Sequence, residues 1–229
     1  MDYSQLEEKL GLEFKNIDLL EQAFTHRSFL NENKNLKRGH NERLEFLGDA
    51  VLELVTTEFL YKKFPQKTEG DLTSLRSSLV NTNTISEVAS ELGFNEYLFL
   101  SKGEAKDTGR ARQYILANTF ESVVASIYLD QGFDKAQAFI EKFLFSKLDQ
   151  ILEEGSWIDS KSKLQEIIQD KLSITPSYET INESGPDHNK TFTAKVTYGK
   201  NSSAEGSGKS KQEAEQKAAM EALKKEGWF

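Results

Sequence analysis

Apolar residues recur at intervals of three and four through most of the first two thirds of the chain. This spacing, with few runs of β-branched residues, is typical of amphipathic α-helices. It predicts helices over residues 4–10, 17–30, 41–61, 72–93, 114–131 and 134–152. Gly, Asn, Pro and charged residues replace the pattern at 31–35, 64–70 and 101–109, which predicts loops there. Residues 1–152 are therefore expected to form an all-α domain.

The pattern changes beyond residue 158. Residues 153–158 interrupt the helical spacing and are expected to be a short linker. After them we expect a helix over 159–171, strands over 178–184, 191–198 and 202–207, and a final helix over 209–226. This α-β-β-β-α order predicts a small α+β domain over residues 159–229.

The composition fits one or two soluble domains with hydrophobic cores, since 37% of the 229 residues are hydrophobic and 29% are charged. The sequence has no Cys, which excludes disulfides and thiolate metal sites. Neither a signal-peptide pattern nor an apolar run of about 18 residues occurs, so no membrane segment is expected. These features predict a cytoplasmic protein.

The net charge of −8 argues against binding nucleic acid through a general excess of positive charge. The acid excess lies in residues 1–158, which hold 18 Lys and Arg against 26 Asp and Glu, whereas residues 159–229 hold 11 of each. Any RNA contact is therefore expected to use local basic patches. An acidic active site would need a cation before a phosphodiester could approach.

Three carboxylates share one face of the predicted helix over 41–61. At about 100° per residue, Glu42, Glu45 and Asp49 lie within roughly 60° of one another. The residues expected on the opposite, core-facing stripe are Leu44, Leu47, Val51 and Leu54. The carboxylates repel one another unless a hard divalent cation, such as Mg²⁺ or Mn²⁺, offsets their charge. A solvated acidic face is the alternative, and charge spacing alone favours it.

Phe46 lies on the acidic side of this helix, away from the leucine stripe. An exposed ring beside a site that must stay ordered indicates that a partner surface covers it. We therefore expect a homodimer with Phe46 at the interface. Packing of Phe46 against another helix of its own domain is the alternative.

A second candidate face lies on the predicted helix over 114–131. Asn118 and Glu121 are spaced i, i+3, with the small residues Ser122 and Ala125 on the same side. Small neighbours allow another helix, or a metal ion and substrate, to come close. Considered alone, an Asn and a Glu on a helix indicate little about function.

The segment Asn41-Glu-Arg-Leu-Glu-Phe-Leu-Gly-Asp-Ala-Val51 resembles the signature of the ribonuclease III family. Thr25-His26-Arg27-Ser28 and Glu69-Gly70-Asp71-Leu72 through Leu75-Arg76 are similar to the flanking motifs of that family, in the same order. Residues 116–121 resemble its second catalytic helix. The likeness covers essentially the whole chain and is greatest for bacterial members with one nuclease domain and one RNA-binding domain. It implies a ribonuclease III nuclease domain over residues 1–152.

The resemblance implies Mg²⁺-dependent endonucleolytic cleavage of double-stranded RNA, with Mn²⁺ as a substitute, in the processing of rRNA and mRNA precursors. The products would carry 5′-phosphate and 3′-hydroxyl ends with short 3′ overhangs. Glu45, Asn118 and Glu121 would hold the metal, and Asp49 and Glu42 would be further ligands or orienters of water. Metal would activate water and stabilise the leaving oxygen, so no covalent nucleophile is expected.

This chain has Asn118 where the family usually has Asp. An amide oxygen can coordinate Mg²⁺ but brings no charge, which predicts weaker metal binding. The alternative to an enzyme is a catalytically silent double-stranded-RNA-binding protein that keeps the fold. The other acidic positions match the family, which favours the enzyme.

The second domain resembles a double-stranded-RNA-binding domain, a likeness carried by Gly185-Pro186-Asp187-His188 and by residues 206–211. The last helix is expected to begin at Lys209-Ser210-Lys211, where N–H groups, the helix dipole and two ammonium groups would bind phosphate. The resemblance implies that Gln165, Glu166 and His188 contact the minor groove and its 2′-hydroxyls.

Three further features of the sequence bear on phosphate binding. Gln212 stands where many relatives have a second consecutive Lys, which predicts weaker phosphate contact. An ATP phosphate loop at residues 208–210 is excluded because Ser203 stands where that motif needs Gly, so no nucleotide cofactor is expected. The basic residues of the loop before the second acidic helix, Lys106, Arg110 and Arg112, are either a phosphate contact or an ordinary solvated loop.

Overall fold

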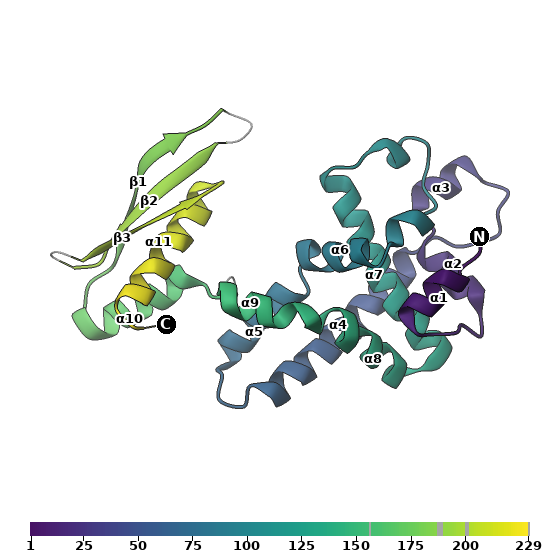
Figure 1. Ribbon diagram of the computed structural model, residues 1–229, viewed down its shortest axis with the longest axis horizontal. Helices are drawn as coiled ribbons and strands as arrows, with labels where there is room; N and C mark the ends of the chain where they lie inside the picture. The colour runs from purple at the N-terminus through teal and green to yellow at the C-terminus, as the bar shows by residue number, and fades with distance from the viewer. Residues whose placement is uncertain (156, 187–189, 200–201, 229) are drawn as a thin grey trace. The chain divides into compact units, whose positions relative to one another are not determined.

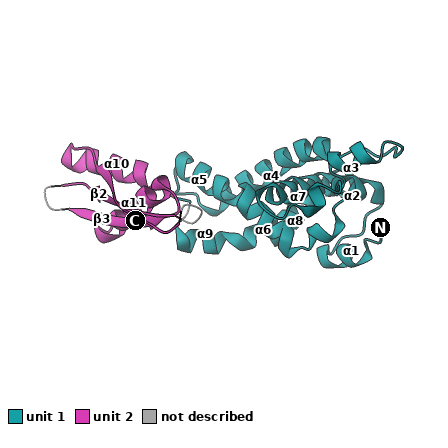
Figure 2. Ribbon diagram, turned by 90° about the horizontal axis from the view of Figure 1, so that it is seen from above, with its two compact units in different colours: residues 1–157 teal, residues 158–229 magenta. Residues whose placement is uncertain are grey.

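The computed structural model describes residues 1–155, 157–186, 190–199 and 202–228. The chain divides into two compact units, Met1–Trp157 and Ile158–Phe229, which are coloured separately in Figure 2. The first unit is helical and the second combines helices with one sheet, as the sequence predicted. No helix in these described ranges combines the length and the apolar character needed to cross a membrane.

The α-helices of the first unit are α1 (Ser4–Leu10), α2 (Ile17–Ala23), α3 (Arg27–Glu32), α4 (Glu42–Lys63), α5 (Glu69–Leu79), α6 (Thr82–Glu91), α7 (Arg110–Gln131), α8 (Phe133–Phe143) and α9 (Leu148–Glu154). Short 3₁₀ turns lie at Phe94–Tyr97, Glu104–Lys106 and Phe145–Lys147. The predicted helix over 134–152 is therefore interrupted, and its last part, α9, continues to Glu154.

Two of the predicted helices are each divided in the structure. The prediction of one helix over 17–30 is wrong because Thr25 forms a parallel bridge with Phe99, which separates α2 from α3. The prediction of one helix over 72–93 is also wrong. α5 ends at Leu79, and Asn81 caps α6, its side chain accepting a hydrogen bond from the backbone N–H of Thr84 (3.0 Å).

The core of the first unit is built around α4 and α7, which pack against each other (Figure 1). Its buried residues on these two helices include Leu44, Val51, Leu52 and Val55 from α4 and Phe120, Val123, Val124 and Ile127 from α7. The expectation that Leu54 belongs to the core stripe is wrong, because its side chain is 57% exposed. Val55 takes the core position, and Leu54 lies about 100° round the helix from it.

The second unit consists of α10 (Ser160–Leu172), β1 (Ser177–Ser184), β2 (Thr191–Thr197), β3 (Ser203–Gly208) and α11 (Lys211–Lys225). The three strands form an antiparallel sheet in the order β1-β2-β3, and α10 and α11 pack together against it (Figure 1). Leu164 and Ile168 of α10 meet Val196 of β2 and Leu223 of α11 in its core.

Glycine brings β3 and α11 into close contact. A β-carbon on Gly206 would lie 2.2 Å from the backbone nitrogen of Ala218, so a larger residue would push the helix away from the sheet. The last helix begins at Lys211 and not at the predicted Lys209. Ser210 is its N-cap and accepts a hydrogen bond from the backbone N–H of Glu213 (3.1 Å).

Candidate active site

The acidic face of α4 begins at a buried anchor, Asn41. Its backbone N–H donates to the carbonyl oxygen of Thr25 (2.9 Å), and its own carbonyl oxygen accepts from the hydroxyl of Ser122 on α7 (3.3 Å). Glu42 and Glu45 follow in the first turn of α4. The start of the acidic face is thus fixed both to α7 and to the segment before α3.

α4 and α7 cross at backbone contact, with Gly48 of α4 against the peptide group of Glu121. A β-carbon at position 48 would overlap that group, so glycine is required there. On α7 the small side chain of Ser122 is buried and donates to the carbonyl oxygen of Asn118 (2.7 Å). These small residues let the polar faces of the two helices meet.

Four of the predicted site residues interact across this crossing. Asn118 is hydrogen-bonded to the carboxylate of Glu45. Burial raises the pKa of Glu121 to about 8, and the nearby carboxylates of Asp49 and Glu45 add to the rise. Burial also raises the pKa of Glu45, followed by repulsion from Glu42 and Asp49, while the bond from Asn118 opposes the rise. The structure therefore brings Glu45, Asp49, Asn118 and Glu121 into one electrostatic cluster.

Glu42 lies at the edge of this cluster and has an arginine and a histidine as neighbours of its own. Nη1 of Arg27 lies 3.2 Å from one of its carboxylate oxygens, and Nδ1 of His40 lies 3.8 Å from the other. His26 N-caps α3 beside this group, and burial lowers the pKa of its ring. The Thr-His-Arg-Ser motif is thus placed next to the acidic face.

One carboxylate of the acidic face, Glu53, was missed in the sequence. It follows Asp49 by one helical turn and is among the groups that raise the pKa of Glu121. Nε of Arg76 on α5 lies 2.9 Å from the Glu53 carboxylate, and Nη1 of Arg76 donates to the Thr57 hydroxyl (2.9 Å). Extending the i, i+3, i+7 spacing by four residues would have identified Glu53.

The donor set at the crossing consists of carboxylate and amide oxygens. Such oxygens, without thiolate or imidazole, are the ligands that suit a hard cation such as Mg²⁺. Within the described ranges, no three His, Cys, Asp or Glu side chains are already close enough together to hold a metal ion. The residues therefore fit a divalent cation by their chemistry, and binding one requires the carboxylates to turn toward a common point.

Phe46 projects from α4 with 82% of its side chain exposed. The alternative that it packs within its own domain is therefore wrong for the single chain. Tyr61, four helical turns further along α4, is 72% exposed. The exposure of Phe46 agrees with the partner surface expected there, whereas Tyr61 lies about 22 Å further along the helix and is not part of one contiguous patch.

Arg110 and Arg112 were predicted to lie in the loop before this helix, but they belong to the first turn of α7. Both terminal nitrogens of Arg112 donate within the unit, one to the side chain of Asn95 and one to the carbonyl oxygen of Glu104, each at 2.7 Å. Arg110 lies over the ring of Tyr114. These contacts disfavour the phosphate-contact alternative for Arg112, because its guanidinium group holds the preceding segment to the helix.

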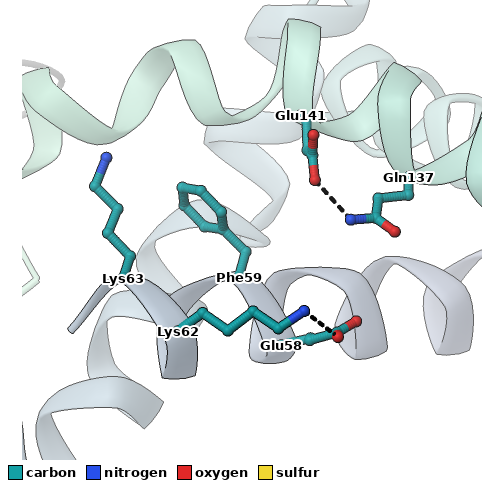
Figure 3. A pocket seen from close by; sticks show the side chains of 6 residues that line it. All are labelled: Glu58, Phe59, Lys62, Lys63, Gln137 and Glu141. Carbon is teal, nitrogen blue, oxygen red and sulfur yellow. Dashed lines mark hydrogen bonds and ion pairs between the residues drawn. The ribbon is translucent and has the colours of Figure 1, made fainter. Parts of the chain in front are cut away.

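A pocket between α4 and α8 lies apart from the carboxylate cluster (Figure 3). Glu58, Phe59, Lys62, Lys63, Gln137 and Glu141 line it. Figure 3 shows that Lys62 pairs with Glu58 on α4 and that Gln137 donates to Glu141 on α8. These charged groups are satisfied by neighbours on their own helices, so the pocket does not indicate a ligand.

The predicted RNA-binding residues lie on the surface of the second unit. Gln165 and Glu166 are exposed on α10, and Lys209 and Lys211 are exposed at the start of α11. The ammonium group of Lys211 is ion-paired with Glu183 of β1 (3.0 Å). The remaining predicted contact, at residue 188, lies outside the described residues.

Comparison with known proteins assigns both units. A family model described as "Ribonuclease-III-like" matches residues 16–148, and one described as "Double-stranded RNA binding motif" matches residues 160–226. The chain belongs to the ribonuclease III family. It is therefore an endoribonuclease whose helical nuclease domain is followed by a double-stranded-RNA-binding domain.

Individual relatives agree with this assignment. The chain is 42% identical over 226 residues to "Ribonuclease 3" of Listeria monocytogenes, with 97% of each chain covered. It is 45% identical over 223 residues to "Ribonuclease 3" of Dehalococcoides mccartyi, covering 97% of this chain and 94% of that one. The solved nuclease domain of ribonuclease III from Campylobacter jejuni matches with a TM-score of 0.58 and 37% identity, covering 63% of this chain and 97% of that one.

Proposed function

We propose that this endoribonuclease hydrolyses double-stranded RNA with Mg²⁺, leaving 5′-phosphate and 3′-hydroxyl ends. The observation that supports the proposal most strongly is the meeting of Glu45, Asp49 and Glu121 at the crossing of α4 and α7. Such a concentration of carboxylates, one of them partly buried, raises the free energy of the folded chain when they are ionised, unless a cation offsets the charge. A bound divalent cation would offset it and supply the catalytic chemistry.

The proposed division of roles follows the geometry of the cluster. Glu45, Asn118 and Glu121 hold the cation, and Asp49 completes the set from the next turn of α4. Glu42 orients water at the edge, where Arg27 holds its carboxylate in place (3.2 Å). When bound, Mg²⁺ lowers the pKa of the attacking water and stabilises the leaving oxygen, and Mn²⁺ substitutes for it.

Asn118 contributes an oxygen ligand without charge, and its amide also donates a hydrogen bond to Glu45. The bond favours the ionised form of the Glu45 carboxylate, although burial and the neighbouring carboxylates outweigh it and raise the pKa of Glu45. We propose that the site binds Mg²⁺ more weakly than one with Asp at this position and remains active. A catalytically silent protein would have no functional reason to keep the other carboxylates together.

The active form is proposed to be a homodimer with Phe46 at the interface. Its ring is exposed in the single chain and flanked in sequence by Glu45, so covering it would also order the acidic site. The solved nuclease domain from Campylobacter jejuni is described as having structural flexibility in a region involved in dimer formation of that protein. Two acidic sites facing one duplex would cut both strands with a stagger, giving short 3′ overhangs.

The second unit is proposed to hold the duplex through Gln165, Glu166, Lys209 and Lys211, together with residue 188. Structured precursors of rRNA and mRNA are the proposed substrates, since A-form duplexes are read mainly by shape. The acidic first unit makes this attachment important, because it repels RNA until a cation is bound. The cytoplasmic location stays a prediction from the sequence.

The test is cleavage of an end-labelled, fully paired RNA with Mg²⁺, with Mn²⁺ and with chelator. We expect cleavage only with a divalent cation, and we expect products that accept a labelled phosphate at the 5′ end only after phosphatase treatment. Efficient cleavage in chelator, or products with 3′-phosphate ends, would contradict the proposed chemistry. Binding without any cleavage would leave the silent alternative standing.

A further inference from the structure

Two lysines from separate parts of the second unit meet at a single carboxylate, that of Glu183 on β1. Nζ of Lys211 lies 3.0 Å from one carboxylate oxygen, and Nζ of Lys190 lies 3.1 Å from the other. Lys211 is the first residue of α11, and Lys190 directly precedes β2. Glu183 thus links three elements through two separate ion pairs.

The ring of Phe192 forms the floor of this cluster. In the sheet, Phe192 lies directly opposite Glu183. The ammonium groups of Lys190 and Lys211 lie 5.9 Å and 5.7 Å from its ring centroid. Both ammonium groups therefore lie near the Phe192 ring, at the outer range of a cation–π contact, which adds a weak attraction to the ion pairs with Glu183.

Glu183 remains ionised in this arrangement. Hydrogen bonds from Lys211 and then Lys190 hold the pKa of its carboxyl below the ordinary value. A carboxylate with one oxygen on each ammonium group resembles an RNA phosphate in charge and in its acceptor oxygens.

We propose that Glu183 is an internal competitor of RNA phosphate that sets the affinity of the Lys190–Lys211 cluster. In the free protein its carboxylate is shared by the two ammonium groups and offsets one of their two positive charges. When duplex RNA binds, a phosphate replaces the Glu183 carboxylate at one or both ammonium groups. Because the carboxylate must be displaced, Glu183 lowers the affinity of these lysines for RNA. This inference rests on the proposed function, in which Lys211 contacts phosphate, and it adds Lys190 to the contact surface.

Two measurable consequences follow. Removing the charge of Glu183 frees both ammonium groups, so duplex affinity rises by about two- to fivefold at low salt, in line with exposed ion pairs. Without Glu183 the cluster brings one more net positive charge to the RNA phosphates, so binding releases more of the counterions condensed on the RNA. The dependence of log K on log salt therefore becomes steeper by up to about one unit.

The experiment measures binding of the full chain to a labelled RNA duplex in chelator, at four or more salt concentrations. The variants are Glu183→Gln, Lys211→Ala and the double variant, each checked for folding by its melting temperature. Glu179→Gln is the matched control, since Glu179 is exposed on the same strand and opposes Lys195 in the register. Glu179→Gln changes the net charge by the same amount as Glu183→Gln, but at a position away from α11.

We expect Glu183→Gln to bind the duplex more tightly than the parent and with a steeper salt dependence. Glu179→Gln should bind like the parent. In the double variant, Lys211→Ala should remove most of the affinity gained from Glu183→Gln. Weaker or unchanged binding by Glu183→Gln overturns the inference, as does an equal gain from Glu179→Gln. If Lys211→Ala binds like the parent, the proposed phosphate contact itself is wrong. A failure of the inference about Glu183 is thus distinguishable from a failure of the proposed phosphate contact at Lys211.

Discussion

A β-carbon placed on Gly48 would lie 1.8 Å from the backbone carbonyl oxygen of Glu121. The acidic faces of α4 and α7 meet because glycine removes the side chain that would hold the helices apart. Glu121 lies at this contact and Asp49 lies beside it, so their carboxyl groups become electrostatic neighbours. Helix packing and the chemistry of the site therefore depend on the same position.

Gly48→Ala is expected to lower both stability and cleavage. The added methyl group has no space, so the helices must separate, which costs about 1–3 kcal/mol of unfolding free energy and moves the carboxylates apart. Melting temperature and cleavage rate, the latter measured well below the melting transition, check this. Gly70→Ala in α5 is the control, because the nearest atom to a β-carbon there is the Thr68 side-chain oxygen at 3.9 Å. Parent-like stability of Gly48→Ala would contradict the packing account.

The raised pKa of Glu121 predicts how stability depends on pH without metal. In the unfolded chain this carboxyl ionises near its ordinary value of 4.5, whereas the folded chain holds the proton to about pH 8. The unfolded state therefore releases its proton first, and this contribution to stability is lost as pH rises from about 4.5 to about 8. We expect the melting temperature in chelator to fall across this range.

Glu121→Gln should flatten that fall, because an amide has no proton to lose. At pH 8 in chelator the variant should be more stable than the parent by roughly 1–3 kcal/mol. Adding Mg²⁺ should raise the melting temperature of the parent much more than that of the variant. Identical pH profiles for the two proteins would show that Glu121 does not carry the buried charge.

Asn118→Asp tests the one amide side chain among the proposed metal ligands. A carboxylate at this position adds charge toward the cation, so the Mg²⁺ concentration at half-maximal rate should fall by roughly threefold or more. The same change removes the hydrogen bond to Glu45, so the variant should be less stable in chelator at pH 8. Asn118→Ala should raise the Mg²⁺ requirement. An unchanged requirement in Asn118→Asp would mean that this side chain lies outside the metal site.

Phe46→Glu tests the dimer. If the exposed ring is an anchor of the interface, a charged residue there should weaken dimerisation by about 30-fold or more and lower cleavage at dilute concentration. Sedimentation velocity and cleavage rate over a concentration series measure both effects. Leu129→Glu, at an exposed apolar residue of α7, is the control and should stay dimeric. A parent that is monomeric at full activity would refute the dimer.

The sequence predicted the helical unit and the α-β-β-β-α unit correctly because both rest on local periodicity. It failed where a distant segment decides the outcome. The break between α2 and α3 at Thr25 comes from a bridge to Phe99, 74 residues further along the chain. The start of α11 was a local error, since Ser210 followed by Glu213 is a recognisable capping pattern.

At the site, helical spacing alone placed Glu45 and Asp49 on one face and predicted the exposure of Phe46. It could not show that α7 crosses that face, because nothing local links Gly48 to Glu121. Only the family resemblance paired the two helices before the structure did. The salt bridge from Arg76 to Glu53 is another tertiary contact, between α4 and α5, that periodicity does not contain.

The central claim is that carboxylates at the crossing of α4 and α7 cut RNA while the second unit holds it. The most direct measurement compares the parent with Glu121→Gln for single-turnover cleavage of one RNA duplex in Mg²⁺ and for binding of the same duplex in chelator. The variant should lose cleavage by at least about 100-fold while its dissociation constant stays within about twofold. Parent-like cleavage by Glu121→Gln would contradict the claim.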